Sequence, residues 1–123
     1  MLTLWGYDMS DEISNRRPYI IELLQLLASE EEQLAYERNV PHVNITVELL
    51  CMWFDDRYHP DEAVFVSCFT TDELSALAEF HRFYDERKDQ LPPGEGTVRT
   101  WLDSPVWRDV MLKAKSTLEQ IAA

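Results

Sequence analysis

Glycine is scarce in this chain, which has three in 123 residues. Phosphate-binding loops of the G-x-G-x-x-G or Walker type need several glycines, because these let the backbone approach the phosphates closely. Runs of 18 apolar residues are also absent, so the sequence predicts no membrane span. The opening residues MLTLWGYDMSDE lack a basic region followed by a long apolar one, and we therefore expect no signal peptide.

Cysteine is scarcer still, with only Cys51 and Cys68. Both lie among apolar residues, and they do not form a C-x-x-C pattern. This arrangement favours two buried thiols in a reducing compartment over a disulfide bridge. We therefore expect a cytoplasmic protein.

Positive charge is the third shortage, because 11 basic residues face 23 acidic ones and give a net charge of −12. The imbalance lies in residues 1–96, which hold 20 acidic and 7 basic residues, whereas residues 97–123 hold 3 and 4. Nucleic acids and anionic membranes bind through Lys and Arg that neutralise phosphates, so we expect neither as a partner. A basic protein is the partner that this charge would attract.

Apolar residues at helical spacing are what the chain does contain, and 46% of its residues are hydrophobic. We predict an all-α or mostly α fold, a compact single helical domain over residues 1–123 with about four to five helices. Residues 1–13 alternate too briefly to decide between a short N-terminal strand and an irregular arm.

Caps and helix breakers predict where the helices begin and end. The first begins at Ser14 or Asn15, has Pro18 in its first turn, and breaks near Ser29 before continuing to about residue 38. Thr70 and Glu73 form a capping box that begins a helix ending near residue 90. Residues 63–69 are predicted as an extended or irregular connection that lies on the core, and residues 91–96 as a loop. Further helical segments are predicted at 43–54, 97–102 and 105–121.

The segment from Val43 to Phe54 carries two competing periods. Val43, Ile45 and Val47 alternate as in a strand, but positions 43, 47, 50 and 54 follow helical spacing. The run has no internal Gly or Pro and exceeds the usual strand length of about 5 or 6 residues. We therefore predict a central helix that is apolar on nearly every side.

A group of titratable side chains follows this segment. Asp55 and His59 stand four residues apart, so they can share a helix face where a carboxylate and an imidazole bind a divalent metal or exchange a proton. A catalytic zinc normally has three protein ligands, so this pair alone predicts no catalytic residue, metal or other cofactor. A solvated helix end before Pro60 is the simpler interpretation. His81 lies on an apolar stripe and is predicted to be a hydrogen-bonded residue at the core boundary.

Three functions stay open, because no motif places the chain in a named family. We favour a non-enzymatic, acidic protein–protein interaction domain, an inhibitor or immunity-type protein that blocks a basic partner. In size and charge alone the chain is similar to small acidic immunity proteins and antitoxin-like inhibitors. The alternatives are a self-associating structural or accessory protein that forms a homo-oligomer such as a homodimer, and a small metal-dependent enzyme that uses Asp55 and His59. The predicted partner-binding residues are Asp55, Asp56, Asp61, Glu62 and Asp72.

Overall fold

The computed structural model describes residues 9–93 and 97–122. Within these residues the chain forms helices and no strand, which confirms the predicted all-α class. The described part holds seven α-helices, more than the four or five expected. They are α1 (Met9–Ala28), α2 (Glu30–Asn39), α3 (Ile45–Cys51), α4 (Ala63–Ser67), α5 (Thr71–Arg87), α6 (Val98–Leu102) and α7 (Pro105–Ala122), with a π-helical segment η1 (Met52–Arg57) and a 3-10 turn η2 (Lys88–Gln90).

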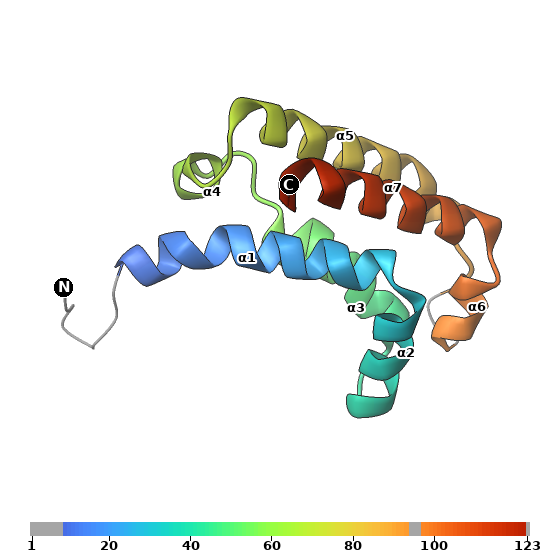
Figure 1. The fold of residues 1–123 in the computed structure, drawn as a ribbon. Coiled ribbons are helices and arrows are strands. Elements are labelled where there is room, and N and C mark those ends of the chain that lie inside the picture. Colours follow the sequence, from blue (N-terminus) through green and yellow to red (C-terminus); the bar gives the residue numbers. More distant parts are fainter. Residues whose placement is uncertain (1–8, 94–96, 123) are drawn as a thin grey trace.

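The long helices α5, α7 and α1 lie in that order, so α7 packs between the other two (Figure 1). Helix α2 leaves the end of α1 at a steep angle, and α6 lies beside α2. Segment η1 and helix α4 also pack against α1, and α4 lies beside the start of α5 (Figure 1). Aromatic rings dominate the core, and the largest fully buried ones belong to Trp53, Phe65, Phe80, Tyr84, Trp101 and Trp107.

The break between α1 and α2 occurs at Ser29, as predicted, and its hydroxyl accepts a hydrogen bond from Glu32 N at 3.1 Å. Gln33 then turns back, and its Nε2 donates to the carbonyls of Leu26 and Leu27 at 3.1 Å each. Its Oε1 accepts a hydrogen bond from Trp107 Nε1 at 3.0 Å. A fully buried amide thereby satisfies the last carbonyls of α1 and joins that helix to α7.

The central helix is confirmed, but its details differ from the prediction. It begins at Ile45, because the side chain of Asn44 caps it by accepting hydrogen bonds from the backbone N–H groups of the next turn. The helix is not buried on every side, because Val47, one of its apolar residues, is 45% exposed. The helix therefore has an outer face, and it continues beyond the predicted end as η1.

Two boundary predictions were wrong. Helix α1 begins at Met9, so Ser14 and Asn15 are not its caps, and Pro18 lies in its interior rather than its first turn. Residues 63–67 form a helical turn instead of an extended or irregular connection, and this turn buries Phe65. Its ring packs against that of Phe69, just beyond the helix, with centroids 5.0 Å apart. The predicted strand or arm is helical over residues 9–13, and residues 1–8 lie outside the described part.

The capping box of α5 is confirmed, and Glu73 within it has a second role. The Thr70 hydroxyl accepts from Glu73 N, and the Glu73 carboxylate accepts from Thr70 N. The same carboxylate forms two 2.7 Å hydrogen bonds with the guanidinium of Arg17 on α1. Arg17 also donates to the carbonyls of Cys68 and Ile121, at 3.3 and 2.9 Å. One arginine thus joins the ends of α4, α5 and α7 to α1.

The variant Glu73→Gln tests this clamp, because Gln keeps an oxygen for the capping box but loses the charge. We expect the free energy of unfolding near pH 7 to fall by about 1 kcal/mol, since the pair is bidentate but partly exposed. The Arg17 hydrogen bonds hold the pKa of Glu73 at about 2, below its usual 4.5. The wild-type contribution is therefore complete above pH 4.5 and is lost as the pH falls toward 2. Urea denaturation at stepped pH values measures both effects.

The variant Glu79→Gln provides the control, because it removes a more exposed ion pair, the 3.0 Å contact with Lys113. Its effect should be smaller than that of Glu73→Gln. Identical acid profiles for wild type and Glu73→Gln would contradict the assigned role of the clamp.

Candidate functional site

The π-helical segment η1 is the local feature from which the site is built. Tyr58 N donates to Trp53 O at 3.3 Å, a bond that spans five residues instead of four. In a regular α-helix, side chains five positions apart diverge by about 140°. The wider turn lets the Trp53 and Tyr58 rings stack in the core, with centroids 4.7 Å apart and planes at 10°. Such π-helical turns frequently occur at functional sites.

Arg57, at the end of η1, contacts the exposed side of α1. Its Nη1 donates to Tyr19 O at 3.0 Å, its guanidinium lies 5.4 Å from the centre of the Tyr19 ring, and it is 3.9 Å from a Glu22 carboxylate oxygen. A hollow lies on each side of this contact.

The first hollow, here named the polar hollow, has a volume of about 120 Å³. Within it, the carboxylate of Glu62 lies 3.7 Å from Arg16, and His59 Nε2 donates to Asp56 O at 2.9 Å. Mixed charges in so small a space suit contacts with a few polar groups better than enclosure of a small molecule. It is lined by Arg16, Tyr19, Asp56, Arg57, His59 and Glu62.

The second hollow, the apolar hollow, has a volume of about 250 Å³ and lies between α1, α2 and η1. Leu23 and Met52 are buried beneath it, and Leu26, Ala35 and Tyr36 are half-buried. Burial raises the pKa of the Tyr36 phenol, and the charge of Glu48 raises it further while Arg57 lowers it. The lining residues are Glu22, Leu23, Leu26, Glu32, Ala35, Tyr36, Met52 and Arg57.

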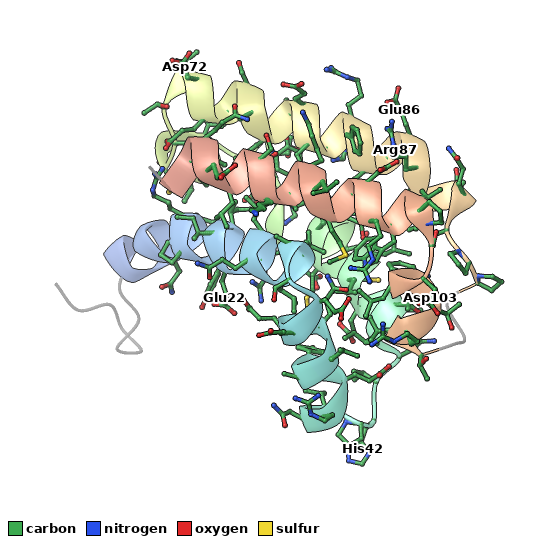
Figure 2. The ribbon with its side chains drawn as sticks, turned by 45° about the vertical axis from the view of Figure 1, so that its right-hand side comes forward. Glu22, His42, Asp72, Glu86, Arg87 and Asp103 are labelled. Carbon is green, nitrogen blue, oxygen red and sulfur yellow. The ribbon has the colours of Figure 1, made fainter. Side chains whose placement is uncertain are left out.

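The five predicted partner-binding acids are all exposed, and two of them line the same hollow. Asp56 and Glu62 line the polar hollow together, and Asp61 lies in the turn immediately before Glu62. Asp55 lies near Cys51 instead, because its hydrogen bond and charge add to burial in raising the pKa of that thiol. Asp72 projects outward from the start of α5 (Figure 2) and lines neither hollow.

Asp55 and His59, the residues of the alternative site, form no hydrogen bond with each other in the described part of the chain. The His59 ring is engaged with the carbonyl of Asp56. Across residues 9–93 and 97–122, no three His, Cys, Asp or Glu side chains converge as a potential metal site.

Cys51 and Cys68 are half-buried thiols, less buried than predicted. The raised pKa of Cys51 disfavours its reactive thiolate form.

His81 has the structural role that its place on the apolar stripe predicts. It is half-buried, and its Nδ1 accepts a hydrogen bond from Trp53 Nε1 at 3.1 Å. Its ring also packs against Phe54 and Tyr58, at centroid distances of 5.3 and 5.0 Å. Because Nδ1 accepts here, the ring is held in the tautomer that carries its proton on Nε2.

Arg57, Tyr19 and Tyr36 were missed by the sequence analysis. Arg57 belonged to the titratable segment, but nothing in the sequence shows that it would reach α1, 38 residues earlier. Tyr36 lies in a short acidic helix with no motif around it. These residues form a site only through the packing of η1 against α1 and α2.

Comparison of the chain with protein-family models, curated proteins and solved structures gives no match. No helix in the described residues has the length and apolarity needed to cross a membrane.

The variant His81→Phe tests the hydrogen bond beneath η1. It keeps an aromatic ring but leaves the fully buried Trp53 N–H without an acceptor, so we expect the free energy of unfolding to fall by about 1–3 kcal/mol. His81→Asn, which retains an acceptor oxygen, should lose less. Urea denaturation followed by tryptophan fluorescence measures the difference. His42→Phe, at an exposed position, serves as the control and should leave stability nearly unchanged.

Proposed function

We propose that this chain is an acidic protein–protein interaction domain, of inhibitor or immunity type, that docks on and blocks a basic protein. The observation that carries the proposal is the exposure of the acids around η1. Asp55, Asp56 and Asp61 are exposed within seven positions of the chain, and none of them has an ion-pair partner among the described residues. Their negative charge is directed to solvent.

Other acids in the fold are used internally. Glu30 pairs with Arg108 at 2.6 Å, and Glu79 pairs with Lys113 at 3.0 Å, so two of the three basic residues of α7 are paired with neighbouring helices. Arg17 is likewise occupied by Glu73. These pairs use acids of α2 and α5, whereas Asp55, Asp56 and Asp61 are among the exposed acids that remain available to a partner.

A surface of this kind acts mainly on the rate and specificity of association. Negative charge accelerates the approach of a positively charged protein and repels acidic ones. Added salt weakens this attraction, because the Debye length falls from about 10 Å at 0.1 M to about 3 Å at 1 M. A cytoplasmic location belongs to the same proposal, since it would keep the two thiols reduced.

A pull-down from the native host tests the proposal with two baits that have lost the same charge. One is the triple variant Asp55→Asn, Asp56→Asn, Asp61→Asn. The other removes three exposed acids from the C-terminal helices, as Asp103→Asn, Asp109→Asn, Glu119→Gln. We expect wild type to capture a basic protein, and the first triple variant to bind the purified partner at least about tenfold more weakly.

The second triple variant should bind within about twofold of wild type, because its charges are removed from a different surface. Equal losses for both variants would show that only net charge matters. Capture of none but acidic proteins, or of other copies of the chain alone, would contradict the proposal.

A further inference from the structure

The exposed acids Asp55, Asp56 and Asp61 are here named the acidic surface. The apolar hollow between α1, α2 and η1 adds a second, apolar element to it. We infer that this hollow anchors an apolar side chain presented by a basic amphipathic helix of the partner. The inference rests on the proposed function, because it names the part of the interface that holds the basic protein once charge has attracted it.

The floor of the hollow suits an apolar anchor. Leu23 is fully buried and Met52 is 8% exposed, while Leu26 and Ala35 are half-buried at its walls. A space of about 250 Å³ accommodates side chains rather than a large ligand. Anchors of this kind, inserted into a pocket and surrounded by polar groups, contribute most of the binding energy at many interfaces.

The rim of the hollow specifies the charge of the partner. Glu22 and Glu32 are both exposed, and Glu32 has no ion-pair partner in the described part of the chain. Figure 2 shows Glu22 projecting from the side of α1 that faces away from α7. Among the described residues, Arg57 is the single basic one that lines the hollow, and it is engaged with Tyr19 and Glu22. Lysines or arginines flanking the anchor would therefore meet carboxylates.

The polar hollow extends this surface along α1. Tyr19 lies one helical turn before Glu22 and Leu23, and Arg57 lines both hollows. Asp56, at the far side of Arg57, adds an exposed carboxylate to the rim, whereas Glu62 lies 3.7 Å from Arg16. A helix lying along α1 can place an apolar residue in one hollow and a cation at the other, as an amphipathic helix does when it binds in a groove.

Three designed peptides of equal length, about 18 residues, test the inference. The first combines leucines at helical spacing with lysines, the second scrambles the same residues so that no apolar stripe forms, and the third replaces lysine with glutamate. Titration calorimetry with the full chain measures their binding. We expect the amphipathic basic peptide to bind at least about tenfold more tightly than the scrambled one, and the acidic peptide not to bind.

Variants with matched controls locate the binding site. Ala35→Phe fills the hollow, and Ala78→Phe places the same ring at an exposed position on α5. Glu32→Lys reverses a charge on the rim, and Glu31→Lys makes the same change at an exposed neighbour that does not line the hollow. We expect each hollow variant to weaken binding of the amphipathic peptide at least about tenfold, and each control to stay within about twofold. Circular dichroism verifies that Ala35→Phe folds, and Glu32→Lys provides an independent test if it does not.

The possible failures are distinguishable. If both basic peptides bind equally tightly, or if the hollow variants bind like their controls, the hollow is not an anchor while the acidic surface remains a binding surface. If no basic peptide binds, the inference and the proposed function both fail.

Discussion

The fold depends on the way one guanidinium group, that of Arg17, is shared among four helices. The group satisfies a carboxylate at the start of α5, a carbonyl after α4 and a carbonyl near the end of α7, at distances between 2.7 and 3.3 Å. Arginine suits this position because its planar fork carries five donors in fixed directions. At the C-terminal end of α1, the buried amide of Gln33 joins α1 to α7. Polar side chains thus attach α1 to its neighbours near its middle and at its C-terminal end.

These two attachments determine which side of α1 is free. Ile20, Leu24 and Leu27 are fully buried, so the side of the helix that carries Tyr19 and Glu22 faces outward. Segment η1 reaches this outer side because its wider turn keeps Trp53 and Tyr58 stacked in the core while Arg57 extends to α1. The hollows on either side of Arg57 therefore follow from core packing. A regular α-helical turn would rotate the side chains of η1 and change the hollows' shape.

Features set by neighbouring residues could be predicted from the sequence, and features set by distant ones could not. The capping box of Thr70 and Glu73 was predicted because both partners lie within one turn. The helical turn around Phe65 was mistaken for an extended connection, because its aromatic and β-branched residues favour strands until tertiary packing decides otherwise. The acids near η1 were visible in the sequence, whereas the contact of Arg57 with α1 required the fold.

The separation of Asp72 from the hollows bears on how such a domain would recognise a partner. Asp72 projects outward from the start of α5 (Figure 2) and lines neither hollow. A standard interface buries about 800 Å² on each partner, and a small helical contact confined to the two hollows would not include Asp72. Asp72 would then act through its long-range field, which influences the association rate. The acids at the hollows would act in contact with the partner, where close charge pairs and a buried anchor slow dissociation. Net charge and local shape would therefore make separate contributions to the proposed binding, and only the second would depend on the π-helical turn.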